Sequence, residues 1–177
     1  SDRGGRSDII GIVETHLQRE DNVNIKGYIT KVRRDRDSQG GGVMIAIKEK
    51  YSHVYAEVVE VENKEKELEQ IWIDMGSKTK YRIGLVYAAQ GDKQKVKEIE
   101  QNMKRIEKEI RKGKEDGRKV FVMGDFNAKV DREEDEGKIK SKGGKKLKEV
   151  AETNGMIFIN EMKVTEGKRT RVENGKK

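Results

Sequence analysis

The chain has 177 residues, of which 41% are charged and 32% hydrophobic, and its net charge is +7. This length is sufficient for one domain with a hydrophobic core. No apolar run approaches the ~20 residues of a membrane span, and no signal peptide is recognisable, so we expect no membrane partner. Cysteine is absent, which excludes disulfides and thiolate metal sites. A reducing compartment is thus permitted, and we expect an intracellular protein, nuclear or cytoplasmic.

The positive charge is concentrated in the last quarter of the chain. Residues 138–177 contain 12 Lys and Arg against 5 Asp and Glu, whereas the other 137 residues contain 28 of each. A basic segment beside a neutral body is compatible with a polyanion such as DNA. A solvated, lysine-rich surface is the alternative interpretation.

The chain begins with a polar arm and a strand. Residues 1–7 have no apolar periodicity, and we expect a flexible arm there. Residues 8–13 are rich in isoleucine and valine and predict a buried strand, which ends at Glu14. A carboxylate at the end of a buried strand is costly unless it is paired, bound to a metal or at the rim. His16 is interpreted as a local hydrogen-bonding residue rather than a catalyst.

Short apolar or alternating runs predict further strands. They cover residues 28–32, 43–47, 54–61, 68–75 and 81–87. The runs at 54–61 and 68–75 alternate between apolar and polar residues, which predicts half-buried strands.

Three segments of the chain are rich in glycine or in acidic residues. The glycines at 40–42 are followed by no helical pattern and no GK[ST], so they do not predict a phosphate-binding loop. The acidic run at 57–69 is interpreted as a solvated face, and so are the acids at 131–136.

The clearest helix follows Asp92, a plausible N-cap. Apolar residues then recur at a helical spacing, and a single apolar stripe of this length favours packing on a sheet over a coiled coil. The stripe consists of Val96, Ile99, Met103, Ile106 and Ile110, and we expect the helix to end near Gly113.

A second helix is predicted from Gly143-Gly144 to a stop at Asn154-Gly155. Its inward side chains are Leu147, Val150 and Ala151. The apolar residues 156–160 then predict a strand, and residues 173–176 a hairpin turn.

Between the helices, residues 120–123 are apolar without alternation, which predicts a central strand covered on both faces. The strand leads into Gly124, where the backbone can turn sharply. Asp125 and Asn127 follow two residues apart, so both side chains can point the same way. A carboxylate and an amide together suit work on a phosphate, although these residue types also form ordinary turns.

Gly124-Asp125-Phe126-Asn127 resembles the GDFN motif of the endonuclease/exonuclease/phosphatase superfamily. Glu14-Thr15-His16 is similar to the superfamily's ETH/ETK motif. Tyr87 stands where the superfamily has a Tyr-x-Pro element, although Ala89 replaces the usual proline. The glycine-led strand at 43–47 and the helix and strand at 143–160 also follow the order of this superfamily. The Tyr-Ala-x-Gln sequence that begins at Tyr87, together with the C-terminal residues, is most similar to the endonuclease domain of RTE-type non-LTR retrotransposons, or of a host gene derived from one.

The resemblance implies an α/β sandwich of two mixed sheets with outer helices, the DNase-like fold, over residues 8–177. This domain would be partial, because the superfamily's opening asparagine strand and its closing Asp and Ser-Asp-His motifs have no match in these residues. His53 cannot be assigned the role of the missing histidine.

The resemblance also assigns roles to individual residues. Glu14 and Asp125 would hold Mg²⁺ or Mn²⁺, and Asp125 would orient the attacking water. Asn127 and Tyr87 would bind the phosphate, and Thr170 is a candidate contact to the DNA backbone. We expect the first four of these residues to converge at one end of the sheets.

The implied function is Mg²⁺-dependent hydrolysis of DNA phosphodiesters, weak or absent in these 177 residues alone. A reverse-transcriptase domain, or a second chain that completes the fold, is an implied partner. Two alternatives stay open: a nuclease-like domain that binds DNA or protein without catalysis, and a phosphoesterase for small substrates.

Overall fold

The computed structural model describes residues 7–35, 41–63, 68–88, 96–128 and 142–159. Its strands are β1 (Ile9–Val13), β2 (Tyr28–Arg34), β3 (Val43–Lys48), β4 (Ala56–Val59), β5 (Leu68–Met75), β6 (Tyr81–Ala88) and β7 (Lys119–Asp125). Its helices are the short 3₁₀ helix η1 (Glu49–Tyr51) and the α-helices α1 (Val96–Glu115) and α2 (Lys142–Thr153). Most of the predicted elements are therefore present, with shifted ends.

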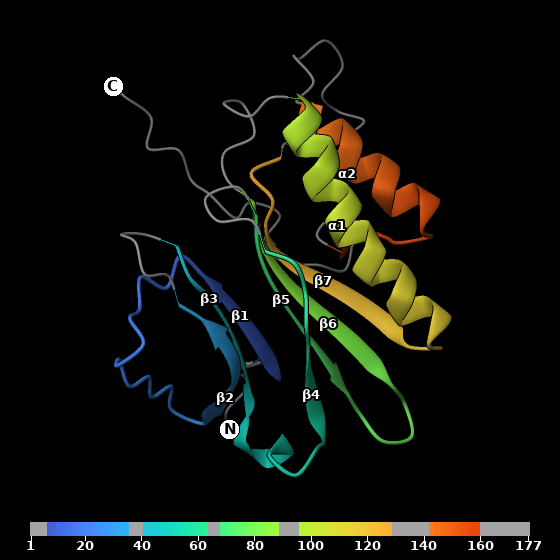
Figure 1. The fold of residues 1–177 in the computed structure, drawn as a ribbon. Helices are drawn as coiled ribbons and strands as arrows, with labels where there is room; N and C mark the ends of the chain where they lie inside the picture. Colours follow the sequence, from blue (N-terminus) through green and yellow to red (C-terminus); the bar gives the residue numbers. More distant parts are fainter. Residues whose placement is uncertain (1–6, 36–40, 64–67, 89–95, 129–141, 160–177) are drawn as a thin grey trace, which may run out of the picture.

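The strands form two sheets, and the two α-helices cover one of them (Figure 1). The first sheet has the order β1-β3-β2 and is antiparallel throughout. The second has the order β4-β5-β6-β7, in which only β6 and β7 are parallel. Helix α1 makes the crossover that a parallel pair requires. Of the two mixed sheets that we expected, only the four-stranded one is mixed.

A first core fills the space between the two sheets. Its buried members are Val43 and Ile45 from β3, Ile71, Ile73 and Met75 from β5, and Ile83 and Leu85 from β6. These side chains alternate along their strands, as expected for the inner face of each sheet. Strand β1 comes close to the second sheet at Gly11, where an added Cβ would lie 2.6 Å from Leu85 Cδ1.

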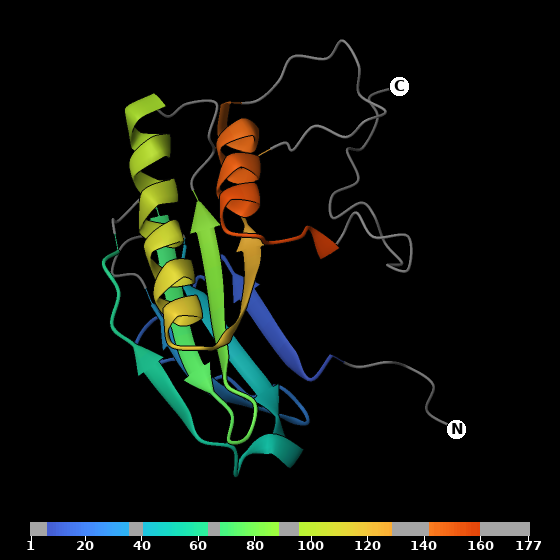
Figure 2. The ribbon, with the colours of Figure 1, turned by 90° about the vertical axis from the view of Figure 1, so that its right-hand side faces the viewer.

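A second core lies between the four-stranded sheet and the helices, which stand side by side on its outer face (Figure 2). It contains Ile99, Met103, Ile106 and Ile110, four of the five residues in the predicted stripe of α1. The fifth, Val96, is the first residue of α1 and is 44% exposed. In α2, Val150 and Ala151 are buried and Leu147 is partly buried, as predicted.

Helix α1 ends at Glu115, two residues beyond the expected end near Gly113. Gly117, with φ 68°, makes the stop, and the Arg118 N–H donates to the Gly113 carbonyl. Gly113 instead permits close packing, because an added Cβ would lie 2.8 Å from both Arg82 Cδ and Val120 Cγ2. The expected N-cap Asp92 lies outside the described residues.

The expectation of a half-buried strand at 68–75 is wrong, because all eight residues of β5 are buried. The core between the sheets covers one face of β5 and the helix core covers the other. Its polar residues have partners: Gln70 accepts from Trp72 Nε1 at 2.9 Å, and Asp74 accepts two bonds from Arg82 at 2.7 Å. The alternation of apolar and polar residues in β5 therefore reflects buried polar side chains that have partners, and not a face exposed to solvent.

The expectation of a central strand covered on both faces is also wrong for β7. This strand lies at the edge of its sheet among the described residues, and Phe121 is 45% exposed. The Phe121 ring lies beside Tyr81, with ring centroids 6.1 Å apart. An unbroken apolar run thus did not distinguish an edge strand from a central one.

No strand forms in the described part of 156–160. The Met156 N–H donates to the Ala151 carbonyl, and Gly155 has φ 56°, so these residues end α2 as predicted. Ile157 is 72% exposed and Ile159 is 51% exposed. The apolar run is present, but its first residue caps the helix instead of starting a strand, and Met156 packs against the helix core.

Candidate active site

Three of the predicted residues meet where β1, β6 and β7 end. Tyr87 and Asp125 are register partners on the parallel strands β6 and β7. The Tyr87 hydroxyl donates a 2.5 Å hydrogen bond to Glu14 Oε1, although the two residues are 73 positions apart and belong to different sheets. The structure therefore brings Glu14, Tyr87 and Asp125 together.

Asn127 joins this group through the turn after β7. Its backbone N–H donates to Asp125 Oδ1 at 2.9 Å, and its side-chain Nδ2 donates to the Ala88 carbonyl at 2.7 Å. An amide nitrogen carries two hydrogens, so the second remains for another acceptor. The turn depends on Gly124, which has φ 136° and whose added Cβ would overlap the Val86 carbonyl oxygen.

The backbone of the site is strained in both of its turns. Glu14, His16 and Asn127 have φ of 52°, 53° and 44°, and they are the non-glycine residues with positive φ in the described ranges. Such conformations cost about 1–3 kcal/mol each, persist only where the surroundings impose them, and concentrate at functional sites. In the described ranges these three residues all lie in the two turns, which supports a functional site at this end of the molecule.

Two glycine carbonyls hold the Glu14 turn. The Thr15 N–H donates to the Gly42 carbonyl at 3.2 Å and the His16 N–H to the Gly41 carbonyl at 2.9 Å. The glycines before β3 therefore support the site rather than bind phosphate. The His16 N–H thus bonds to a residue 25 positions away, and His16 is exposed. The expected local hydrogen bond of its side chain stays a prediction.

The electrostatic environment of the site is acidic. Burial raises the pKa of Tyr87 to about 12, and the hydrogen bond to Glu14 and the charges of Glu14, Asp125 and Glu69 act in the same direction. Tyr87 consequently keeps its proton at neutral pH and is a donor. The charged groups that act on it are all carboxylates, which favours a cation in their midst.

Carboxylate oxygens are the ligands that Mg²⁺ prefers, and this ion usually keeps several waters. Glu14 and Asp125 are both exposed and both act on Tyr87, so the donor set fits a hydrated divalent cation. Within the described ranges, no group of three or more His, Cys, Asp and Glu side chains is arranged to hold a metal. The candidate donors are the carboxylates of Glu14 and Asp125.

Glu69 is the site residue that sequence reasoning missed. We expected it on a solvated face, but it is 3% exposed, and its Oε2 accepts a 2.7 Å hydrogen bond from the Gly42 N–H. It is also the register partner of Tyr87 on β5. The sequence held one signal: period two places Glu69 on the face of Ile71 and Ile73, which line the core between the sheets.

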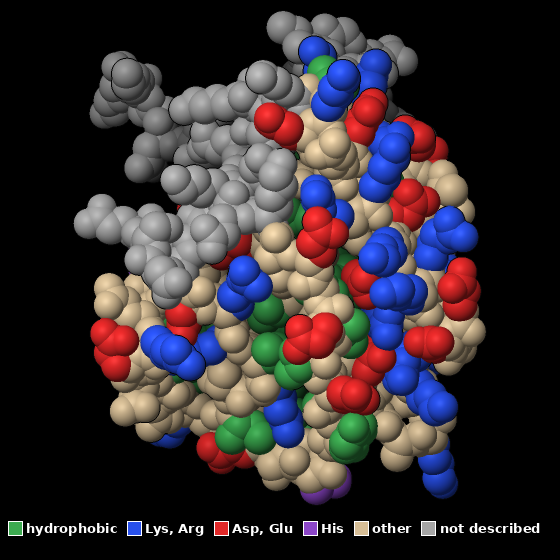
Figure 3. Space-filling view, in the orientation of Figure 1, with side chains coloured by type: hydrophobic (Ala, Val, Ile, Leu, Met, Phe, Trp, Pro, Cys, Tyr) green, Lys and Arg blue, Asp and Glu red, His purple; other side chains and the backbone are tan. Residues whose placement is uncertain are grey.

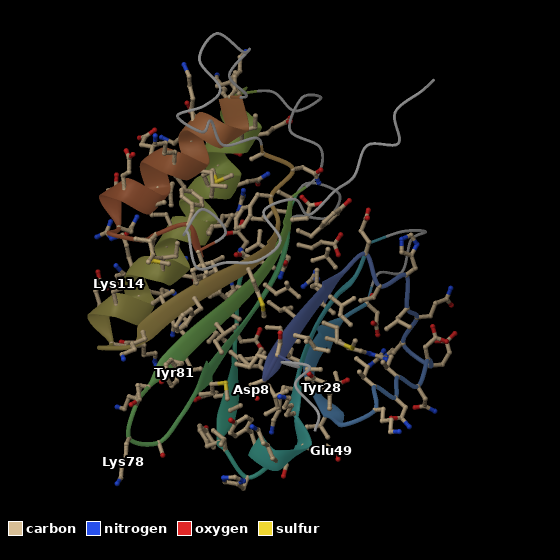
Figure 4. The ribbon with its side chains drawn as sticks, turned by 180° about the vertical axis from the view of Figure 1, so that it is seen from behind. Asp8, Tyr28, Glu49, Lys78, Tyr81 and Lys114 are labelled. Atoms are coloured by element: carbon tan, nitrogen blue, oxygen red, sulfur yellow. The ribbon has the colours of Figure 1, made fainter. Side chains whose placement is uncertain are left out.

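The other candidates lie elsewhere. His53 follows η1, and Figure 4 shows Glu49 of η1 near Asp8, which precedes β1, whereas Glu14 follows the other end of that strand.

Thr170 lies outside the described residues, as do the predicted turn at 173–176, the acids at 131–136 and most of the basic segment 138–177. Over α1, Lys and Arg side chains alternate with Asp and Glu (Figure 3).

Comparisons with protein-family models, with curated proteins and with solved structures found no match to the chain. No helix in the described ranges is long and apolar enough to cross a membrane.

Proposed function

We propose that this chain carries a metal-dependent DNA endonuclease site of the endonuclease/exonuclease/phosphatase type, on a DNase-like sandwich. The observation that carries the proposal is the Tyr87–Glu14 hydrogen bond between the two sheets, with Asp125 beside Tyr87 in register. The ETH-like and GDFN-like segments supply Glu14 and Asp125, and the strained backbone lies in these two segments. The Tyr-x-Pro-like element supplies Tyr87.

Each residue has a chemical role in this proposal. Glu14 and Asp125 would hold Mg²⁺, which when bound neutralises charge on the phosphate that reacts. Asp125 orients the water, and the second Asn127 hydrogen is directed to a phosphoryl oxygen. Tyr87 has one hydroxyl hydrogen, and Glu14 accepts it in this structure. Donation to a phosphate therefore requires Glu14 to exchange this bond for another partner.

DNA is the proposed substrate because of the basic segment 138–177. A net positive segment binds the phosphate backbone without regard to sequence, and this binding weakens as salt rises. A small phosphoester would gain little from such a segment.

The metal site is tested by titrating Mg²⁺ and following backbone amide shifts. We expect shifts at Glu14 and Asp125 with a dissociation constant in the millimolar range, because two carboxylates contribute few ligands. The variants Glu14→Gln and Asp125→Asn should each weaken the response, whereas Glu60→Ala, an exposed residue after β4, should not. An absence of shifts at both sites in the unmodified chain would contradict the metal assignment.

Catalysis is tested by nicking of a supercoiled plasmid. General acid–base catalysis contributes about 10²–10⁴-fold, and the 177 residues contain no match to the family's histidine motif that supplies it. We therefore expect slow nicking that requires Mg²⁺ and that Asp125→Ala abolishes, with Glu60→Ala unchanged. Nicking that persists in Asp125→Ala would overturn the assigned site. Salt-dependent DNA binding without any nicking would favour a domain that binds DNA without catalysis.

A further inference from the structure

A chain of hydrogen bonds leads from the interior of the four-stranded sheet to the Glu14 turn. The buried Glu69 carboxylate accepts from the Gly42 N–H at 2.7 Å. The carbonyls of Gly42 and Gly41 in turn accept from Thr15 and His16, the two residues after Glu14. The first bond joins the Glu69 side chain on β5 to the backbone just before β3, and the next two join that backbone to the residues after β1.

The Glu69 bond is strong for its kind. A carboxylate that accepts from a backbone N–H makes a charge-assisted bond, which is about twice as strong as a neutral one. Glu69 is 3% exposed, so little water competes for this oxygen. Gly42 itself has φ 91°, and an added Cβ would overlap Thr15 Oγ1, so the glycine and the Glu14 turn are in direct contact.

The Glu14 turn needs such support. Both Glu14 and His16 have left-handed backbone conformations that most residues avoid. The Glu14 side chain lies on the surface and accepts the hydrogen bond from the Tyr87 hydroxyl. The backbone beside Glu14 is held by the carbonyls of Gly41 and Gly42, so these contacts set the direction in which the side chain leaves the turn.

We propose that Glu69 is a positioning residue, which fixes the Gly41–Gly42 turn and through it directs the Glu14 carboxylate toward the metal site. Glu69 is a register partner of Tyr87, so the same residue sets both partners of the Tyr87–Glu14 bond relative to each other. This role rests on the proposed function, because Glu69 acts by orienting the Glu14 carboxylate for metal binding. Glu69 itself does not touch the substrate.

The test compares Mg²⁺ titrations of four forms of the chain, followed by amide shifts at Asp125. Loss of a residue that supports a metal ligand typically weakens affinity about 10–100-fold, so Glu69→Ala should weaken Mg²⁺ binding by at least about 10-fold. Glu69→Gln keeps an acceptor oxygen of the same reach and should restore most of the affinity. Glu60→Ala is the matched surface control and should bind as the unmodified chain does.

A double-mutant cycle separates positioning from a direct effect of charge. If Glu69 acts through Glu14, Glu69→Ala adds no loss of affinity in the Glu14→Gln background. Losses that add in full would overturn the proposal, since they would mean that Glu69 affects the cation independently. Equal losses in Glu69→Gln and Glu69→Ala would also overturn it, because only the charge would then matter.

A measurement without metal distinguishes the failure of this proposal from failure of the proposed function. In Glu69→Gln the amide signals of Gly42, Thr15 and His16 should shift together, even if Mg²⁺ never binds. Shifts confined to Gly42 and β5 would refute the positioning role whatever the metal result. If the amide signals of Gly42, Thr15 and His16 shift together but Mg²⁺ causes no shifts, the positioning role of Glu69 is supported and the metal site is refuted. The conservative Gln variant also serves if Glu69→Ala fails to fold.

Discussion

At the scale of single residues, the site combines a neutral hydroxyl with charged carboxylates. Burial is the main cause of the raised pKa of Tyr87, the hydrogen bond to Glu14 comes second, and the charges of Glu14 and Asp125 follow. A tyrosine in this setting donates hydrogen bonds over the whole range in which proteins are usually studied. Its titration is therefore a local probe of the site.

We predict that Tyr87 titrates at about pH 12 in the folded chain, against 10.0 for an ordinary tyrosine. The unfolded chain loses this proton near pH 10, so the stability contributed by the protonated hydroxyl is complete below about pH 10 and lost as the pH rises toward 12. Tyrosinate absorbance measures the transition, and Tyr87→Phe identifies it by difference. Glu14→Gln should move the transition downward; an unchanged transition would contradict the hydrogen bond.

Gly124 should tolerate no other residue. Its φ of 136° and the overlap of an added Cβ with the Val86 carbonyl predict that Gly124→Ala destabilises the fold by more than about 3 kcal/mol. Gly27 is the matched control, because it also has a positive φ, 83°, but nothing within 4 Å of an added Cβ. Gly27→Ala should cost only about 1–2 kcal/mol. Urea unfolding measures both, and equal costs would refute the overlap.

At the scale of elements, a buried ionic cluster joins the four-stranded sheet to α1. Arg82 on β6 makes two 2.7 Å bonds to Asp74 on β5, and its NH1 lies 3.6 Å from Glu109 of α1. Arg118, just before β7, also approaches Asp74, at 3.1 Å. Three strands and a helix thus depend on one set of charges, at the opposite end of β6 from Tyr87.

Asp74→Ala should therefore destabilise the fold by about 3 kcal/mol, since it leaves two buried or half-buried arginines short of a partner. Glu109 and Asp116 near Arg82 limit the loss. Arg111→Ala, which removes an exposed pair with Glu115 on α1, should change stability by no more than about 0.5 kcal/mol. Thermal unfolding compares the stability of the two variants. Similar small losses of stability would show that the buried ionic cluster does not stabilise the packing of α1 on the sheet.

The elements also show what a sequence can and cannot predict. Runs of β-branched residues and the stripe of α1 located most strands and both helices, because period two and period 3.6 follow from backbone geometry. Burial was harder to predict. Glu69 and Asp74 made β5 resemble a half-exposed strand, since no local pattern reveals that a distant Gly42 or Arg82 supplies a partner.

The same limit applies to strand order and to the site. An apolar run predicted β7, yet its place at the edge of the sheet depends on which strands exist beside it. The ETH-like, Tyr-x-Pro-like and GDFN-like segments indicated Glu14, Tyr87, Asp125 and Asn127, which the structure brings together. The support from Glu69 could not be predicted, because it comes from a contact across two sheets.

At the scale of the whole molecule, stability depends on the core between the two sheets. Ile45 of β3 is fully buried there, and Ile45→Ala should cost about 2–5 kcal/mol. Val58 of β4 is 47% exposed, and Val58→Ala should cost less than about 1 kcal/mol. Fluorescence of Trp72, the only tryptophan and fully buried, reports unfolding in denaturant. Equal costs would mean that the sheets do not pack as described.

The hydrogen bond between Tyr87 and Glu14 has a consequence for how the protein is made. The residues of the three-stranded sheet are all synthesised by Lys48, whereas Asp125 is added 77 positions later. Long-range contacts form only after the intervening chain has closed a loop. A ribosome-bound chain can therefore pair β1, β2 and β3 early, but Glu14 can contact Tyr87 and Asp125 only after β6 and β7 have been synthesised. The site is thus assembled only after both sheets have been made.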